Sequence, residues 1–347
     1  MSRVGRIEID ESLYRCRRRQ LIRPFVMAAK VECRAYSLGL QRAVTDFAAV
    51  ESFRQAAARV NEHYGIQVSP SQVRALCQQH AGQLLLEHED ESLELPARGV
   101  KQAIAEIDGS FIPIVESKDG KGDKRKRREH SWREVRLACV RADGRVERKY
   151  GVSMGSVEAA GRAWKRSAIK AGVGQQTAIH GVSDGAAWIV EQLRQQFGKR
   201  ATYLVDFYHL SEYLGGVASH FEGKAGRRWL RLQQQRLKSN KVSAVERELA
   251  KLMSQDSGGE RAAAVVSAAR YVKNHRQYLN YQGAIEKGLP IGSGEVESGH
   301  RVVVQKRLKI SGAWWNPKQA EKMLALQECR ANGEWEAYWK RQCQVRM

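Results

Sequence analysis

The sequence predicts an α/β protein with a mixed-sheet core, an all-helical domain before that core and a helical segment inserted into it. Three observations lead to this prediction. Before position 80, apolar residues recur at the three- and four-residue spacing of a helix. After an acidic stretch at 87–98 that contains Pro96, the period shortens to that of strands. A helical pattern rich in Arg, Lys, Gln and Ala then returns between 210 and 288.

These changes of pattern divide the chain into four parts. A basic arm occupies 1–35, and the predicted helical domain occupies 36–95. The sheet-containing core takes up 100–209 and 289–340, and the helical insertion takes up 210–288. At 347 residues the chain is long enough for two or three domains with a substantial buried core.

Two short helices are predicted within the 36–95 domain. The first covers 51–64, and the second starts at Ser69-Pro70, where Ser is a favoured N-cap and Pro fits the first helical turn. A Gly-containing turn joins them, which is the outline of a helix-turn-helix whose second helix enters a DNA major groove. An ordinary helical hairpin gives the same pattern. Four residues of the second helix are candidates to face a groove: Ser71, Gln72, Arg74 and Gln78.

Strands and helices then alternate in a definite order. Strands are expected over 102–115, 134–141 and 146–152, followed by a helix over 157–171. A fourth strand over 177–182 ends at Ser183-Asp184-Gly185, and a helix over 186–197 and a strand over 201–207 follow. After the insertion, helices are expected over 294–308 and 317–332. This order matches the ribonuclease-H-like layout, a mixed sheet with helices on its faces.

The charge of the chain indicates a polyanionic partner. Lys and Arg together number 59 against 38 Asp and Glu, a net charge of +21, and the basic residues are clustered. An anionic membrane surface would require an amphipathic helix beside these clusters, and the sequence has none there. It also has no apolar run near the ~18 residues that span a bilayer, and 1–6 lacks the apolar core of a signal peptide. We therefore expect a soluble cytoplasmic protein that binds nucleic acid.

Cysteine usage agrees with this compartment. The six cysteines are scattered without a C-x-x-C pair, which argues against a zinc ribbon and against a disulfide framework. We expect reduced, mostly buried thiols. They are Cys16, Cys33, Cys77, Cys139, Cys329 and Cys343.

Three carboxylates acquire positions from the predicted strand order. Asp108 lies on the first strand, Asp184 ends the fourth, and Glu297 lies near the start of the helix after the insertion. They are 76 and 113 residues apart, so only folding would bring them together. Two divalent ions held by carboxylates can cut a phosphodiester, and Mg²⁺ or Mn²⁺ suits such oxygen ligands. For an Asp-Gly that follows a strand, a simple turn is the alternative.

Four ordered blocks carry a resemblance to a known family. They read Ile107-Asp108-Gly109-Ser110-Phe111, Ser183-Asp184-Gly185-Ala186-Ala187-Trp188-Ile189, Val205-Asp206-Phe207-Tyr208-His209, and Gly292-Ser293-Gly294-Glu295-Val296-Glu297-Ser298 with Arg301, Arg307 and Trp315 behind it. From about residue 50 onward the chain resembles bacterial insertion-sequence transposases with an aspartate-aspartate-glutamate triad, within the Mutator-like set and closest to the ISKra group.

The resemblance implies DNA cleavage and strand transfer with two Mg²⁺ or Mn²⁺ ions, in a homo-oligomer assembled on DNA in the bacterial nucleoid. It makes Asp108, Asp184 and Glu297 the catalytic metal ligands. Glu295 is the alternative to Glu297 as the glutamate of the triad. Asp206 and His209 correspond to an accessory Asp-x-x-His pair, and Asp206 is the alternative second aspartate. Asp184 is preferred to Asp206 as the second aspartate because Asp184 lies at the end of the fourth strand.

Further residues are candidates for contacts with double-stranded DNA. The basic run of Lys124, Arg125, Lys126, Arg127 and Arg128 is interpreted as a phosphate clamp, with a solvated loop as the alternative. Arg301, Lys306 and Arg307 follow Glu297 on one predicted helix, where they would contact DNA beside the cut. Trp314 and Trp315 are candidates for stacking on an unpaired base, although adjacent tryptophans often belong to a core. The competing functions are a non-catalytic DNA-binding protein and a nuclease of the same fold.

Overall fold

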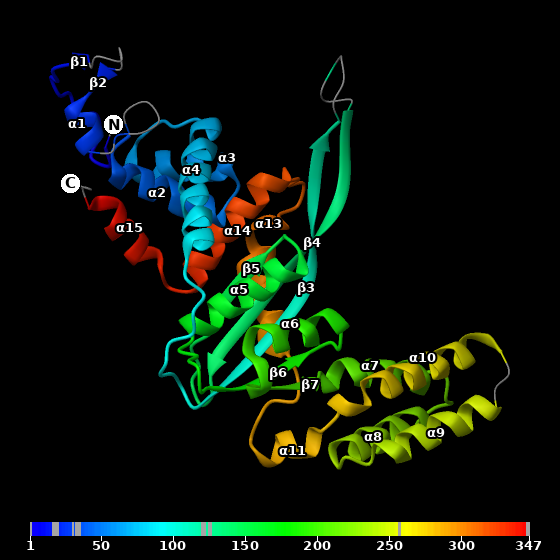
Figure 1. Cartoon of the computed structure of the whole chain (residues 1–347). Helices are drawn as coiled ribbons and strands as arrows, with labels where there is room; N and C mark the ends of the chain where they lie inside the picture. Colours follow the sequence, from blue (N-terminus) through cyan, green and yellow to red (C-terminus); the bar gives the residue numbers. More distant parts are fainter. Residues whose placement is uncertain are drawn as a thin grey trace. The chain divides into compact units, whose positions relative to one another are not determined.

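The computed structural model describes residues 2–15, 21–29, 31, 36–118, 123, 127–255 and 258–344. The chain divides into two compact units, each built from separate segments. Unit 1 comprises Met1–Ser92, Phe111–Val135 and His300–Met347, and unit 2 comprises Leu93–Ser110 and Arg136–Gly299. The described elements are shown in Figure 1.

Unit 2 is a mixed α/β unit built on a five-stranded sheet in the order β5-β4-β3-β6-β7. The strands are β3 (Gln102–Ser117), β4 (Arg128–Ala142), β5 (Lys149–Ser153), β6 (Ala178–Ser183) and β7 (Ala201–Val205). β4 and β5 pair antiparallel, whereas β3 with β6 and β6 with β7 pair parallel. The ends of β3 and β4 beyond Ser110 and before Arg136 belong to unit 1. The expected α/β class with a mixed sheet is therefore confirmed.

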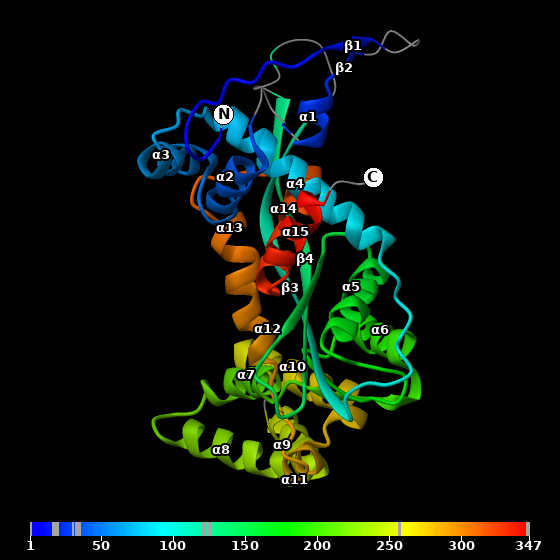
Figure 2. The same cartoon turned by 90° about the vertical axis from the view of Figure 1, so that its left-hand side faces the viewer.

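Two helices cover one face of this sheet, and they lie side by side in Figures 1 and 2. They are α5 (Val157–Lys170) and α6 (Ala187–Phe197). Ala103, Ala105 and Ile107 of β3 share a buried cluster with residues of both helices, including Trp164 and Phe197. Because successive strand side chains point to opposite faces, the even-numbered residues of β3 face away from α5 and α6. Glu106 and Asp108 are among them.

The opposite side of unit 2 carries the helical insertion. Its helices are α7 (Phe207–Ala218), α8 (Ala225–Lys238), α9 (Val242–Gln255), α10 (Gly259–His275) and α11 (Tyr281–Glu286), with a 3-10 turn at Arg276–Tyr278. Another 3-10 turn, at Gly198–Arg200, links α6 to β7 in the core. Their apolar faces form one cluster with residues of β6 and β7, including Val182 and Leu204. The strand predicted to reach 207 ends at Val205, because Asp206 caps α7.

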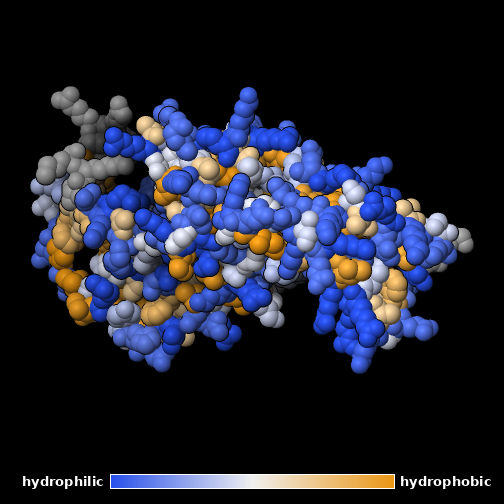
Figure 3. Space-filling model, turned by 90° about the horizontal axis from the view of Figure 1, so that it is seen from below, coloured by the Kyte–Doolittle hydropathy of each residue, from blue (hydrophilic) through white to orange (hydrophobic). Residues whose placement is uncertain are grey.

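The outer surface of the insertion is mostly, but not uniformly, polar. On the right-hand side of Figure 3 hydrophilic residues predominate, with hydrophobic patches between them. Arg227, Arg228 and Arg231 on α8 are exposed. The buried apolar residues of these helices belong to the cluster shared with β6 and β7, as expected for helices that pack mainly on one side.

Unit 1 contains the N-terminal helices and the C-terminal helices. They are α1 (Pro24–Ala28), α2 (Leu38–Val50), α3 (Phe53–Tyr64), α4 (Pro70–Asp90), α13 (Lys306–Leu308), α14 (Pro317–Ala331) and α15 (Trp335–Cys343), with a two-stranded pair β1 (Tyr14–Arg15) and β2 (Leu21–Ile22) in the arm. Ser52 and Ser69 form capping boxes with Gln55 and Gln72, which explains where α3 and α4 begin.

Helix α4 is longer than its sequence pattern indicated. The helical pattern noted before position 80 continues to Asp90, because Ala81 and Leu84 are buried and α4 packs along α14. The acidic stretch at 87–98 is therefore helical as far as Asp90. Likewise, the helix expected over 294–308 is divided into α12 (Gly294–Gly299), a π-helical segment at His300–Gln305 and α13. Gly299 contacts Tyr150 so closely that a Cβ would lie 2.6 Å from the ring.

Among the described residues, Cys77, Cys139 and Cys329 are buried and Cys343 is exposed, and these four form no disulfide with one another. Cys16 and Cys33 lie outside the described residues. No helix in the described part of the chain combines the length and the apolar character needed to cross a membrane.

Candidate active site

The three predicted carboxylates all lie in unit 2, on separate elements. Asp108 is half-buried in β3, and its Oδ1 accepts a hydrogen bond of 2.7 Å from the Gly109 amide. Asp184 follows β6, and its Oδ1 accepts one of 3.0 Å from the Ala186 amide. Glu297 is exposed on α12.

Asp184 and Glu297 lie near enough to Asp108 for their charges to act on its carboxylate. Burial raises the pKa of Asp108 to about 6, against the effect of the Gly109 amide. The negative charges of Asp184 and Glu297 raise this pKa further, and His209 lowers it. Acids from β3, the β6–α6 loop and α12, and a histidine from α7, therefore act electrostatically on one carboxylate, that of Asp108. A cluster of like charges of this kind would be stabilised by a bound cation.

Asp206 has a different role from Asp184. It is buried, 5% exposed, and it is the N-cap of α7. Its Oδ1 accepts from the amides of Tyr208 and His209 at 2.6 and 3.1 Å. Its Oδ2 accepts from the amide and the hydroxyl of Ser293 at 2.7 and 2.5 Å. With both oxygens engaged by four donors, this carboxylate fastens α7 to the segment that leads into α12.

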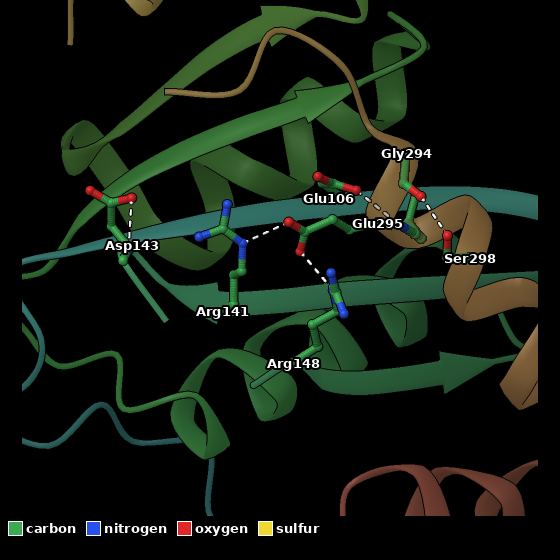
Figure 4. A network of polar contacts seen from close by, with 9 residues as sticks. Glu106, Arg141, Asp143, Arg148, Gly294, Glu295 and Ser298 are labelled. Atoms are coloured by element: carbon green, nitrogen blue, oxygen red, sulfur yellow. Dashed lines mark hydrogen bonds and ion pairs between the residues drawn. The ribbon is translucent and has the colours of Figure 1, made fainter. Parts of the chain in front are cut away.

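Glu295 is likewise engaged in a structural contact. Figure 4 shows its carboxylate between two arginines, Arg141 of β4 and Arg148 just before β5. The oxygen–nitrogen distances are 2.7 Å to Arg141 Nε and 3.0 Å to Arg148 Nε. Glu297, two positions later, is exposed and makes no ion pair with any residue that the structure describes. The geometry therefore leaves Glu297 accessible, whereas Glu295 holds α12 against the sheet.

Glu106 is a buried acid that sequence analysis did not identify. It is 1% exposed, and its Oε2 accepts a 2.8 Å hydrogen bond from the Val296 amide. Its Oε1 has no partner among the described residues. Burial raises the pKa of Glu106 to about 8, the Val296 amide opposes this, and the nearby charges of Glu295 and Asp206 add to it. The pattern of an apolar strand gave no signal for it, because a buried Glu is expected on neither face.

The raised pKa of Glu106 predicts how the stability of the protein depends on pH. In the unfolded chain a glutamate titrates near 4.5, whereas Glu106 in the folded protein titrates near 8. Between these values folding takes up a proton, so the free energy of unfolding should fall as pH rises from about 4.5 to about 8. Urea unfolding of the wild type and of Glu106→Gln across this range measures the effect. The stability of the variant relative to the wild type should increase with pH, and a constant difference would contradict the prediction.

The helical insertion supports the loop that carries Asp184. The Tyr271 hydroxyl of α10 donates to the Asp184 carbonyl, and His275 Nε2 lies 2.9 Å from the Gly185 carbonyl. The Tyr203 hydroxyl accepts from the Gly185 amide at 2.9 Å. Gly185 has φ +94°, and a Cβ there would lie 2.7 Å from His275 Nε2, so this position requires glycine. Sequence analysis missed Tyr271 and His275, since no local pattern links the insertion to the site.

The hydrogen bond from the Tyr271 hydroxyl to the Asp184 carbonyl leads to a testable prediction. Tyr271→Phe removes the hydroxyl and leaves the ring, which stacks on Tyr213 at 4.2 Å between centroids. We expect the free energy of unfolding to fall by about 1 kcal/mol and DNA cleavage to slow by roughly tenfold, because the Asp184 loop loses a fixed contact. The matched control is Tyr278→Phe, whose hydroxyl accepts from Arg194. An equal loss of activity in both variants would contradict a specific role for Tyr271.

The predicted DNA contacts of unit 1 lie in different environments. Arg74, Arg128, Arg301 and Lys306 are exposed, and Arg127 is half-buried. Gln72 uses its amide oxygen in the capping box of α4. Lys124, Arg125 and Lys126 lie outside the described residues. Four exposed cations of unit 1 are therefore available to a polyanion.

Arg307 and Trp315 do not fit their predicted role in DNA contact. Arg307 is 3% exposed, and its Nε donates to the Ala48 carbonyl at 2.8 Å. Its guanidinium lies 4.8 Å from the ring centroids of both Phe53 and Trp315. Trp315 is 6% exposed, and its indole NH donates to the Leu308 carbonyl. Both side chains belong to the interior of unit 1, where the aromatic rings offset the burial of the cation.

We expect Arg307→Ala to lower the free energy of unfolding by about 3 kcal/mol, because a buried carbonyl loses its donor and two rings lose their cation. Arg307→Lys should recover only part of this, since an ammonium does not stack as a planar guanidinium does. Urea unfolding measures both. Arg301→Ala, an exposed arginine of the same unit, is the control and should change stability by less than about 0.5 kcal/mol.

The oxygen donors of the site are chemically suited to Mg²⁺ or Mn²⁺, which prefer carboxylates. The raised pKa of Asp108 agrees with this, because its causes, burial first and then the negative charges of Asp184 and Glu297, are ones that a bound cation would offset. Within the described ranges, no group of three or more His, Cys, Asp or Glu side chains stands in a ready-made metal-binding arrangement.

Comparison with known proteins relates part of the chain to one curated protein. No protein-family model matches the chain. The chain is 25% identical over 170 residues to a UPF0236 protein in the vanSb 3′ region of Streptococcus gallolyticus. The matched stretch makes up 48% of this chain and 36% of that protein, so the chain spans about a third of the length of this curated relative.

Proposed function

We propose that the chain is a DDE-type DNA transposase of the ISKra group, with a ribonuclease-H-like catalytic core that cleaves DNA and joins the cut end to a second DNA. The observation that carries the proposal is that the charges of Asp184 and Glu297, on two other elements of unit 2, both act on the half-buried carboxylate of Asp108. The strand order β5-β4-β3-β6-β7, with its antiparallel and parallel pairs, supports the fold assignment. The net charge of +21 supports DNA as the partner.

The roles of the acids follow from their surroundings. Asp108, fixed in a central strand, and Asp184, in a loop held by α10, would hold metal ions together with Glu297 of α12. When bound, two Mg²⁺ or Mn²⁺ ions supply activation of the attacking hydroxyl and stabilisation of the leaving oxygen. Asp206 is proposed as a structural cap, because all its oxygens accept internal hydrogen bonds. Glu295 is proposed as a positioning residue of α12.

Residues of the chain also orient the reacting groups. The Arg141–Glu295–Arg148 contact and the Glu106–Val296 hydrogen bond fix the first turn of α12, and thereby the backbone of Glu297. His209 lies close enough to Asp108 to lower its pKa. An imidazole at that place can hold or release a proton beside the phosphodiester.

A strand-transfer assay tests the proposal. The purified chain is mixed with duplex DNA that flanks its gene, a supercoiled target plasmid, and Mg²⁺ or Mn²⁺. We expect 3′-hydroxyl ends to appear and to be joined to the plasmid, and both products to vanish with a chelator. Cleavage without joining would make the chain a nuclease of the same fold, and binding without cleavage would make it a non-catalytic DNA-binding protein. Either result would overturn the proposal.

A further inference from the structure

A cavity of about 320 Å³ is lined by residues of unit 1 alone, whereas the three candidate metal-binding carboxylates belong to unit 2. It opens between the start of α3, one side of α4 and the segment that leads into α14. Its lining combines aromatic rings, amides and guanidinium groups. The lining residues used below are Arg74, Gln78, Trp314, Trp315, Asn316 and Gln319.

One wall of the cavity is an exposed aromatic ring held in place by others. Trp314 is 42% exposed. His130 lies against it at 4.4 Å between centroids, and Trp132 at 6.3 Å, both edge-on. Trp315 behind it is buried and packs edge-on against Phe53. The ring of Trp314 is therefore flanked by two other exposed rings, while part of its own surface remains open to a planar ligand.

The polar part of the lining has an unmet hydrogen bond. Gln319 Oε1 is buried and has no partner among the described residues. A buried acceptor without a donor is costly, so a ligand that brings an N–H to this oxygen gains from it. Gln78 and Asn316 add amides that both donate and accept, and Arg74 adds an exposed cation. A flat ring, amide partners for its edge and a cation for a phosphate together match a nucleotide.

We infer that this cavity binds an unpaired base of a DNA strand, and this inference rests on the DNA binding of the proposed function. The base stacks on Trp314, its edge donates to Gln319, and Arg74 contacts the adjoining phosphate. A base inside a duplex has both faces covered by its neighbours, so only an unpaired base offers a face to the ring. Stacking of this kind accepts any base, because every base has a π-face.

The test compares two DNAs and four proteins, the wild type and three variants. The DNAs are a duplex with a short single-stranded overhang and the same molecule with abasic sites in the overhang, and binding is measured by fluorescence anisotropy without metal. Trp314→Ala should weaken binding of the overhang that has bases by about tenfold and leave the abasic DNA unaffected. Trp314→Phe should restore most of the affinity. Leu86→Ala, which removes a similarly exposed apolar side chain from the same unit, should change neither.

A second measurement does not depend on a variant. An overhang with 2-aminopurine should lose fluorescence when the wild type binds, because the probe stacks on the indole. An equal loss of affinity for both DNAs in Trp314→Ala, or no quenching by the wild type, would overturn the inference. So would displacement of the overhang by deoxyadenosine monophosphate at the same concentration, which would indicate a mononucleotide site. Since no cleavage is measured, failure here is distinct from failure of strand transfer.

Discussion

Replacing Asp108 with alanine is expected to abolish metal-dependent DNA cleavage while DNA binding is retained. Asp184→Ala and Glu297→Gln should do the same. Each variant removes one oxygen donor from the site that stabilises the transferring phosphate, and the loss of several kcal/mol slows cleavage by about 1,000-fold or more. Cleavage of a labelled duplex under single-turnover conditions measures the rates, and anisotropy measures binding.

Binding should survive because it depends on different residues. The chain carries a net charge of +21, and the removal of one carboxylate makes this charge more positive. Two exposed acids of the same unit provide matched controls: Asp143→Ala for the aspartates and Glu191→Gln for Glu297. Both should cleave at the wild-type rate. A triad variant that cleaves as fast as these controls would remove that residue from the site.

The same cluster should lower stability in the absence of metal. The pKa of Asp108 is raised to about 6, so at neutral pH its carboxylate is charged at an energetic cost. Asp108→Asn keeps the shape of the side chain and removes this charge. We therefore expect this inactive variant to be at least as stable as the wild type in urea, an exchange of stability for function that is common at active sites.

The sheet and the helices of unit 2 could be located from sequence because their signals are local. The strand expected over 177–182 is Ala178–Ser183, and the helix expected over 186–197 is Ala187–Phe197. Alternation of side chains and the turn around Gly185 are properties of a few adjacent residues. The end of α4 and the π-helical segment after Gly299 are set by packing against distant residues, such as Tyr150, and the local pattern carries no trace of them.

The residues of the candidate site also fall into two groups, those that the sequence could predict and those that depend on distant contacts. The order of strands predicted that Asp108 and Asp184 belong to neighbouring strands, and β3 does pair with β6. A metal site shared with Glu297 stays a prediction. Burial was not predictable for Glu106, which lies in an apolar strand, or for Arg307, which resembles the exposed cations around it in sequence. The choice between Asp184 and Asp206 depends on hydrogen-bond partners, and Ser293 is 87 residues away from Asp206.

Asp206→Ala is expected to destabilise the protein by about 3–4 kcal/mol, a large part of the stability of a typical domain. Loss of the N-cap of α7 costs about 1–2 kcal/mol. The amide and hydroxyl of Ser293 lose their acceptor in a buried place, which costs about 1–3 kcal/mol more. Urea unfolding measures the change, and Asp206→Asn, which keeps one acceptor oxygen, should recover about half of it.

Comparison with Asp184→Ala separates the structural acid from the catalytic one. Asp184→Ala loses a single hydrogen bond, to the Ala186 amide, and also removes a negative charge beside Asp108. It should therefore unfold at nearly the wild-type urea concentration and yet fail to cleave DNA. Asp206→Ala, assayed below its own unfolding midpoint, should retain measurable cleavage, and Ser293→Ala should reproduce part of its instability. An active Asp184→Ala together with a stable, inactive Asp206→Ala would instead make Asp206 the second metal ligand, since stability and cleavage would then depend on the opposite residues.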